Sequence, residues 1–261
     1  MRAMAAVTIL LMTLAAGPAG AGDTASRIEA LEWLTEQYPP YNYVDPEDGL
    51  LKGISVDVLM GMFERCGVGL TRQDVKVVPW ARGYSRTQKT PGVALFAMTY
   101  TEERAQSFRF VGPLIPTRVS VIAAADRGVQ VSSPRDLDEL KIGTIRDDIG
   151  YQLVRALGVP ESAIEQKNSA AQMVQMLARG RFDAIAYAED IAWHQLRLAG
   201  LDPAEYEPVY ALRESYIGYA FHKATDPAVL GALQTALNQM RAEGLVDSAY
   251  VRHMGHLPAQ P

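Results

Sequence analysis

The stretch Val93–Arg118, VALFAMTYTEERAQSFRFVGPLIPTR, places a buried strand, a charged turn and an aromatic segment in close succession. Its first six residues form an apolar run that follows Pro91-Gly92 and is too short for a helix. Such a run is typical of a parallel strand that is covered on both faces. The stretch therefore predicts an α/β fold that is organised around this strand.

Polar side chains follow the predicted strand, namely Thr99, Thr101 and Arg104. In open α/β sheets, ligands bind beyond the carboxyl ends of the strands, where these side chains would lie. The planar guanidinium of Arg104 can donate two parallel hydrogen bonds to one carboxylate. The alternative is that Arg104 is an ordinary surface arginine in an exposed turn.

The run T-x-E-R over 101–104, followed by an aromatic pair and Gly112-Pro113, resembles a known family signature. It is similar to the periplasmic solute-binding proteins of the polar amino-acid ABC-transporter family. Further resemblance comes from G-x-x-x-D over 53–57 and G-R-F-D-A over 180–184. The resemblance extends from about Ile28 to Gly255 and implies a two-lobed clamshell. Each lobe would be a mostly parallel sheet flanked by helices, and the chain would cross between the lobes at two hinges.

The resemblance also implies how the chain is divided. We expect a signal peptide over 1–21, and a first lobe, lobe 1, made of residues 22–118 and 213–261. Residues 119–212 would form the second lobe, lobe 2, as an insertion.

The N-terminus has the pattern of a secretory signal. Met1-Arg2 is a positive start, Ala5–Ala16 is an apolar run, and Ala19-Gly20-Ala21 is a small-x-small cleavage site. We predict cleavage after Ala21. The single cysteine, Cys66, lies far from this site, so no lipid anchor is expected. These features predict a soluble protein of the periplasm of a Gram-negative bacterium.

Composition narrows the possible partners. The chain of 261 residues is 48% hydrophobic and 21% charged, which is ordinary for globular proteins. A formal charge of −5 and a pI near 5.5 argue against a nucleic-acid partner. The sequence contains no metal-ligand spacing and no P-loop. We expect a monomer that binds no metal and no cofactor.

The resemblance assigns roles to residues at strand ends. Arg104 would clamp the carboxylate of the ligand, and Thr99 and Thr101 would add hydrogen bonds. Tyr38 and Tyr41 flank Pro39-Pro40, where the family places an aromatic ring that stacks on the ligand. Tyr41 packing under its own loop is an equal alternative.

The segment W-A-R-G-Y, residues 80–84, follows a second predicted strand. Trp80 is a candidate pocket wall, and Arg82 is a candidate second anion contact. The alternative is that Trp80 caps the lobe and Arg82 is solvated.

Acidic residues occupy two corners of the predicted cleft. Asp147 and Asp148 precede a helix where relatives carry small hydroxyl residues or glycine. They either cap that helix or face a cationic group of the ligand, and Asp148 is the candidate ligand contact. Glu189 and Asp190 follow a strand where relatives place the acid that pairs with the ligand's amino group. Glu189 is favoured for that role, with Asp190 as the alternative.

Two expectations concern secondary structure near the N-terminus. The alternation over Ile28–Leu34 predicts a strand. Ser55 or Asp57 is expected to start the following helix, because either side chain can accept from free backbone amides.

The function that the resemblance implies is the capture of an amino acid or amino-acid-like carboxylate and its delivery to an ABC permease. We expect no enzyme, because no catalytic motif is present and the histidines at 194, 222, 253 and 256 form no ligand-like cluster. Two alternatives remain. One is a cyclohexadienyl-dehydratase-like enzyme, in which Glu189, Asp148 or Asp147 would act as the acid. The other is a ligand-binding subunit for a membrane sensor.

Overall fold

A computed structural model describes residues 19–255 of the chain. The predicted signal peptide over 1–21 therefore lies almost wholly outside the described residues, as does the end of the chain. The first described element is helix α1 (Ala19–Glu29). Among the described helices, none is long and apolar enough to cross a membrane.

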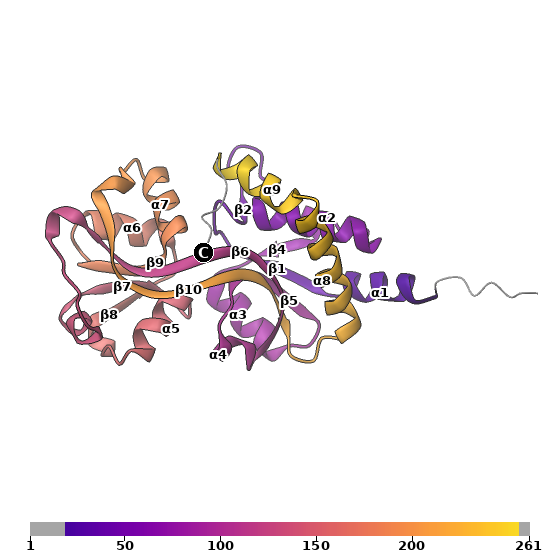
Figure 1. The fold of residues 1–261 in the computed structure, drawn as a ribbon, viewed down its shortest axis with the longest axis horizontal. Helices are drawn as coiled ribbons and strands as arrows, with labels where there is room; N and C mark the ends of the chain where they lie inside the picture. The colour runs from indigo at the N-terminus through magenta and orange to yellow at the C-terminus, as the bar shows by residue number, and fades with distance from the viewer. Residues whose placement is uncertain (1–18, 256–261) are drawn as a thin grey trace, which may run out of the picture.

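The chain folds into two lobes that are joined by a pair of long strands (Figure 1). One lobe holds the parallel strands β1 (Glu32–Thr35), β4 (Val75–Val77) and β5 (Val93–Thr99). The other holds the parallel strands β7 (Ile142–Ile145), β8 (Ile164–Lys167) and β9 (Ala184–Ala188). This arrangement confirms the predicted α/β fold class with two lobes.

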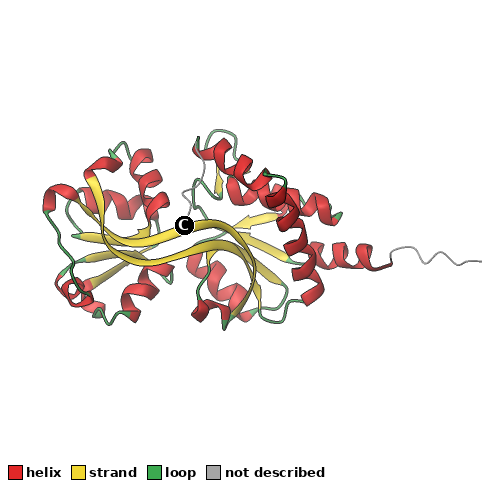
Figure 2. Cartoon of the chain, viewed as in Figure 1, coloured by secondary structure: helices red, strands yellow, loops and turns green. Residues whose placement is uncertain are grey.

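Strands β6 (Phe108–Ala124) and β10 (Tyr206–His222) run antiparallel through both lobes. They connect all the long strands of the described chain into one sheet with the order β4-β1-β5-β10-β6-β9-β7-β8. Figure 2 shows the two strands curving together from one lobe into the other. The expected lobe boundaries fall inside this pair, where Arg118 lies opposite Glu214 and Val119 opposite Arg213. The boundaries themselves stay a prediction.

Helices cover both faces of the sheet in each lobe (Figure 1). Those of lobe 1, besides α1, are α2 (Ile54–Cys66), α3 (Trp80–Lys89), α4 (Glu102–Ala105), α8 (Pro227–Ala242) and α9 (Leu245–Met254). Those of lobe 2 are α5 (Ile149–Ala156), α6 (Ala170–Ala178) and α7 (Glu189–Leu198). A small hairpin of β2 (Tyr43–Val44) and β3 (Leu51–Lys52) precedes α2. Short 3₁₀ turns lie at Arg72–Asp74, Ala125–Arg127, Pro134–Glu139, Glu161–Ala163 and Pro203–Glu205.

Several predicted elements are confirmed. All seven residues of β5 are buried, as expected for a strand that is covered on both faces. The five residues of β9 are also all buried. The run Asn168-Ser169-Ala170 predicts a helix cap, and helix α6 does begin after Ser169, whose side chain accepts a hydrogen bond from the amide of Gln172.

The predicted strand over Ile28–Leu34 is wrong in its first half. Helix α1 continues to Glu29, and β1 begins only at Glu32. Ile28 and Trp33 are both buried, and the indole nitrogen of Trp33 donates to the carbonyl of Ile28 across the intervening turn. Two buried residues five positions apart fit a helix, a turn and a strand as well as they fit one continuous strand.

The predicted start of helix α2 is also wrong. The helix begins at Ile54, and the residue before it is Gly53 at a φ of 121°. A side chain at position 53 would bring its Cβ within 2.3 Å of the carbonyl oxygen of Tyr41. Glycine is therefore required at this position by backbone conformation and by space.

Asp57 joins α2 to the C-terminal helix instead of capping α2. Its carboxylate accepts hydrogen bonds from Arg72 (Nη2, 2.7 Å) and Arg252 (Nη1, 2.8 Å), and lies 3.0 Å from His253 Nε2. Burial raises the pKa of this carboxyl, but hydrogen bonds from His253 and Arg72 outweigh burial and bring the pKa to about 2. The cluster therefore fixes α9 against α2 in its ionised form.

We predict that Asp57→Asn lowers the free energy of unfolding at pH 7 by ~1–2 kcal/mol, measured by urea denaturation. The pKa of Asp57 is about 2 in the fold, below its ordinary value of 3.8. The ionised Asp57 carboxylate therefore stabilises the fold fully when the pH is above the ordinary pKa, and this stabilisation is lost as the pH falls towards 2. The difference in the free energy of unfolding between Asp57→Asn and wild type should shrink as the pH falls over that range. Asp138→Asn, at an exposed position, is the control, and an equal effect of both variants would refute the role of Asp57.

Candidate functional site

Arg104 lies at the centre of the candidate site, directly after the carboxyl end of β5. Thr101 positions it, because the Thr101 hydroxyl caps α4 by accepting from the amide of Arg104 (3.0 Å). The side chain of Arg104 is only 1% exposed. Its Nη1 donates to the carbonyl of Thr99 (3.0 Å), and its Nε donates to Gln152 Oε1 on α5 of lobe 2 (3.1 Å). Arg104 is thus held from both lobes, and the alternative of a surface arginine is excluded.

Two aromatic rings from α3 face the guanidinium. The Cζ atom of Arg104 lies 5.4 Å from the ring centroid of Trp80 and 5.5 Å from that of Tyr84. Both distances are within the range of cation–π attraction. The segment W-A-R-G-Y therefore supplies rings to the arginine as well as a candidate wall for a ligand.

One nitrogen of Arg104 is left without a hydrogen-bond acceptor. Nη2 is buried and makes no hydrogen bond to any residue within 19–255. Its nearest carboxylate oxygen is Asp148 Oδ1 at 3.8 Å, which is beyond hydrogen-bonding distance. A buried donor without an acceptor is costly, so this atom marks the place where an external acceptor would be stabilised.

Asp148 is buried at the start of α5, and its side chain makes no capping hydrogen bond to that helix. Burial raises the pKa of Asp148, and the charge of Arg104 opposes this rise. Burial likewise lowers the pKa of Arg104, against the charge of Asp148. The two groups therefore form a buried pair in which each partly compensates the desolvation of the other.

Asp147 contributes through its backbone. Its side chain is exposed, and its φ of 58° lies in the left-handed region that aspartate tolerates better than most residues. This conformation presents the Asp147 carbonyl to Trp80 Nε1 (3.1 Å) and Gln152 Nε2 (2.9 Å). One carbonyl thereby connects α3 of lobe 1 with α5 of lobe 2.

Tyr38 and Tyr41 are both buried and form an aromatic wall. Their rings stack at a centroid distance of 5.9 Å, and Tyr38 meets Tyr187 of β9 edge-on at 6.0 Å. The amide of Ser55 in α2 donates to the carbonyl of Tyr41 (2.8 Å), at the close approach that requires Gly53. The loop between β1 and β2 is therefore held firmly against α2.

Of the two acids that follow β9, Asp190 is the one that meets lobe 1. The Tyr41 hydroxyl donates a hydrogen bond to Asp190 Oδ2, and burial raises the pKa of this carboxyl. Glu189 instead accepts from the Ser120 hydroxyl on β6 (2.5 Å). The structure therefore places Glu189 beside the crossing strand and Asp190 against the aromatic wall.

The contacts between the lobes define a closed arrangement. Arg104 contacts Gln152 and Asp148, Trp80 contacts Asp147, and Tyr41 contacts Asp190. Seven of the nine sequence-predicted residues, Thr99, Thr101, Arg104, Tyr38, Tyr41, Trp80 and Asp148, are buried. Arg82 is exposed on α3, and its expected role as an anion contact stays a prediction.

A cavity of about 720 Å³, which we call the side chamber, adjoins this group. Its walls come from both lobes: residues of the 36–46 loop, the β4–α3 turn, the α6 start and α7. Trp80 and Tyr187 belong to its lining, and so does Glu36, which sequence reasoning missed. Glu36 directly follows β1, and this position at a strand end is the sequence signal that could have identified it.

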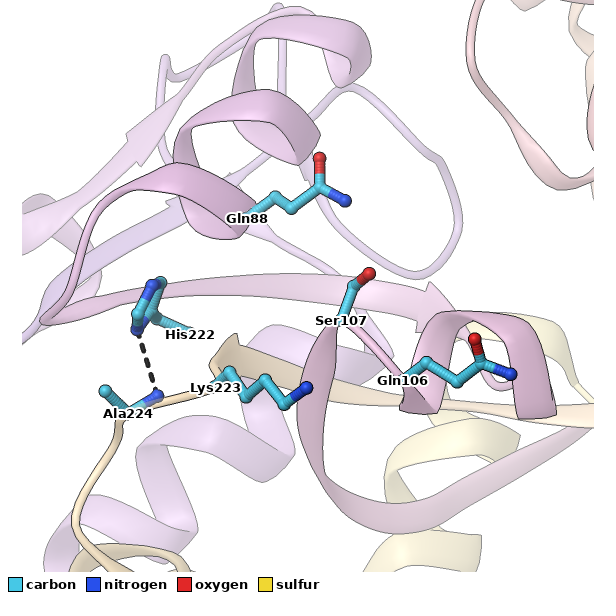
Figure 3. A pocket seen from close by; sticks show the side chains of 6 residues that line it. All are labelled: Gln88, Gln106, Ser107, His222, Lys223 and Ala224. Carbon is cyan, nitrogen blue, oxygen red and sulfur yellow. Dashed lines mark hydrogen bonds between the residues drawn. The ribbon is translucent and has the colours of Figure 1, made fainter.

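A second hollow, of about 480 Å³, lies on lobe 1 (Figure 3). It is lined by Gln88 of α3, Gln106 and Ser107 after α4, and His222, Lys223 and Ala224 at the end of β10. The amide of Ala224 donates to His222 Nδ1 (3.0 Å). Because no residue of lobe 2 takes part, closure of the lobes cannot enclose a ligand there.

Metal chemistry finds no support in the described residues. Within 19–255, no group of three or more His, Cys, Asp or Glu side chains is arranged to hold a metal ion.

Comparison with known proteins places these observations in a family. The family described as bacterial extracellular solute-binding proteins, family 3, matches residues 33–256. No curated protein matches the sequence significantly.

Solved structures share the fold at low identity. An ABC uptake transporter substrate-binding protein from Streptococcus pneumoniae with bound histidine is 15% identical, with a TM-score of 0.77 over 93% of this chain and 99% of its own. A histidine kinase sensor domain similar to periplasmic binding proteins is 20% identical, with a TM-score of 0.75. The match covers 88% of this chain and 98% of the sensor domain. The arginine-, lysine-, histidine-binding protein ArtJ from Geobacillus stearothermophilus is 19% identical, with a TM-score of 0.71. The match covers 87% of this chain and 96% of ArtJ.

We predict that Tyr41→Phe shifts the ligand-free protein towards a more open form. The change removes the hydrogen bond from the Tyr41 hydroxyl and leaves the Oδ2 atom of the buried Asp190 carboxylate without that donor, at a cost of about 1.5–3 kcal/mol to the closed form. Small-angle X-ray scattering should show a larger radius of gyration. Tyr151→Phe is the matched control, because its hydroxyl bonds to Glu161 within lobe 2 alone. An unchanged radius in Tyr41→Phe would show that this bond does not hold the lobes together.

Proposed function

We propose that this chain, which belongs to the bacterial extracellular solute-binding proteins of family 3, captures an amino acid or amino-acid-like carboxylate between its two lobes. In this proposal the ligand carboxylate binds Arg104 and the ligand's amino group binds the acid of the aromatic wall, Asp190. Tyr38 and Tyr41 would pack on the ligand, and Thr99 and Thr101 would hold Arg104 in place. Glu189, the acid favoured from the sequence, remains a second candidate for the amino group.

The observation that carries the proposal is the buried Nη2 of Arg104, which lacks a hydrogen-bond acceptor in the described residues. Nη1 and Nε of the same guanidinium already have acceptors, from β5 and α5. Nη2 has none within the described residues and faces the boundary between the lobes. A carboxylate oxygen there would form a charge-assisted hydrogen bond, which is worth more than a neutral one.

Asp148 would respond to a ligand carboxylate at this position. A second anion near Asp148 favours the protonated form of its carboxyl, and burial already raises the pKa of Asp148 in the same direction. A protonated Asp148 can donate a hydrogen bond to the ligand. In this proposal Asp148, which stands where relatives carry small hydroxyl residues or glycine, becomes part of the carboxylate site.

Ligand contacts from both lobes would stabilise the closed form relative to the open one. We propose that the closed form is delivered to an ABC permease in the periplasm, after removal of residues 1–21. A sensor role is the alternative that a specific finding favours, because a histidine kinase sensor domain is among the similar structures. Binding to purified permease or to a receptor domain separates the two roles.

We predict that Arg104→Lys weakens binding of an amino-acid ligand by about 10–100-fold, because a lysine cannot reproduce the guanidinium fork. Ligands come from a thermal-shift screen of amino acids, organic acids and amines, in which a ligand at 100 times its dissociation constant stabilises by about 2.7 kcal/mol. Arg109→Lys, at an exposed position of β6, is the control.

Two results would contradict this proposal. Equal binding by Arg104→Lys and wild type would remove Arg104 from the site. Recovery of the ligand as a changed product would show catalysis on this fold, with the cleft acids as its source, and would replace the binding-protein function.

A further inference from the structure

Gln152 joins two groups that lie at the boundary between the lobes. Its backbone amide donates to the carbonyl of Asp148 (3.1 Å), which places it in the first turn of α5. Its side-chain Oε1 accepts from Arg104 Nε (3.1 Å), and its Nε2 donates to the carbonyl of Asp147 (2.9 Å). A single side chain of lobe 2 thus contacts the arginine of lobe 1 and the turn that precedes its own helix.

The direction of the Gln152 carboxamide is fixed by its two partners. The Arg104 guanidinium offers donors alone, and the Asp147 carbonyl offers an acceptor alone. Both bonds form when Oε1 points towards Arg104 and Nε2 points towards Asp147. The reversed carboxamide would set donor against donor and acceptor against acceptor. The hydrogen-bond network therefore admits one orientation.

The Asp147 carbonyl closes a ring of contacts around the boundary. It also accepts from the Trp80 indole (Nε1, 3.1 Å), and the Trp80 ring centroid lies 5.4 Å from the Arg104 guanidinium carbon. The ring has two members from each lobe: Arg104 and Trp80 from lobe 1, and Gln152 and Asp147 from lobe 2. Because its members come from both sides, the ring can form only when the lobes are together.

The two lobes hold different nitrogens of the Arg104 guanidinium. Nη1 donates to the carbonyl of Thr99, which belongs to the same lobe, so this bond does not depend on the separation of the lobes. Nε donates to Gln152, which belongs to the other lobe. Because the guanidinium is planar, holding both Nη1 and Nε fixes the direction of Nη2. That direction is therefore set in the closed form.

We propose that Gln152 is a positioning residue, which fixes the Arg104 guanidinium in its ligand-binding orientation once lobe 2 has closed and thereby slows release of the ligand. It acts through Arg104 and does not touch the ligand. The inference rests on the proposed function, in which Nη2 of Arg104 donates to the ligand carboxylate. A hydrogen bond that forms only on closure stabilises the closed complex and leaves the first encounter with the ligand unchanged.

The test separates the rates of association and dissociation. The probe is the tightest-binding of the twenty protein L-amino acids in the thermal-shift screen, and stopped-flow tryptophan fluorescence follows its binding to the mature protein. We expect Gln152→Leu to raise the dissociation rate constant about 10-fold or more, because the variant loses a hydrogen bond to a charged group. The association rate constant should stay within about twofold of wild type.

A double-mutant cycle shows whether Gln152 acts through Arg104. Arg104→Lys removes the planar guanidinium whose direction Gln152 sets. In that background, Gln152→Leu should therefore change the dissociation constant by no more than about twofold. A residue that only held α5 in place would weaken binding to the same degree in both backgrounds.

Control variants separate positioning from a folding effect. Gln175→Leu, at an exposed position of α6 in lobe 2, is the matched control and should bind as wild type does. Thermal unfolding without ligand shows whether Gln152→Leu is folded. Gln152→Met, in which the side chain is unbranched and of similar length, carries the test if Gln152→Leu is not folded.

The outcomes distinguish the inference from the proposed function. If an amino acid binds through Arg104 but Gln152→Leu leaves the dissociation rate constant within about twofold of wild type, the inference is overturned and the proposed function stands. The same conclusion follows if the variant changes only the association rate constant, or if its effect is equally large in the Arg104→Lys background. If none of the amino acids binds, both proposals fall.

Discussion

The structure depends on the burial of the Arg104 guanidinium between two lobes. Removing a guanidinium from water is costly unless hydrogen bonds and opposite charge replace the lost hydration. Here the replacements come from both sides: the Thr99 carbonyl and two rings from lobe 1, and Gln152 and Asp148 from lobe 2. The solvation of one side chain is therefore tied to the separation of the lobes.

The remaining charges give that closed state its chemical character. Asp190 is held by Tyr41, and Asp148 lies near Arg104. Glu36 stands in the wall of the side chamber, with no bond to its carboxylate in the described residues. At the centre of the site, one guanidinium nitrogen of Arg104 lacks a hydrogen-bond acceptor, which the carboxylate of a ligand would supply.

Much of this was accessible from the sequence. The apolar run at 93–98 fixed the central strand, and its polar end pointed to Arg104, because strand ends collect ligand-binding groups. The boundary between α1 and β1 was missed, since two buried residues five apart fit either reading. Glu36 was missed, and the choice between Glu189 and Asp190 stayed open, because the direction of a side chain at a strand end depends on tertiary packing.

The most direct measurement is a crystal structure of the protein grown with the tightest-binding amino acid. We predict that the ligand carboxylate lies within hydrogen-bonding distance of Arg104 Nη2, with the ligand enclosed by Tyr38, Tyr41 and Trp80. A ligand bound elsewhere, with Arg104 in contact only with Thr99, Gln152 and Asp148, would contradict the account.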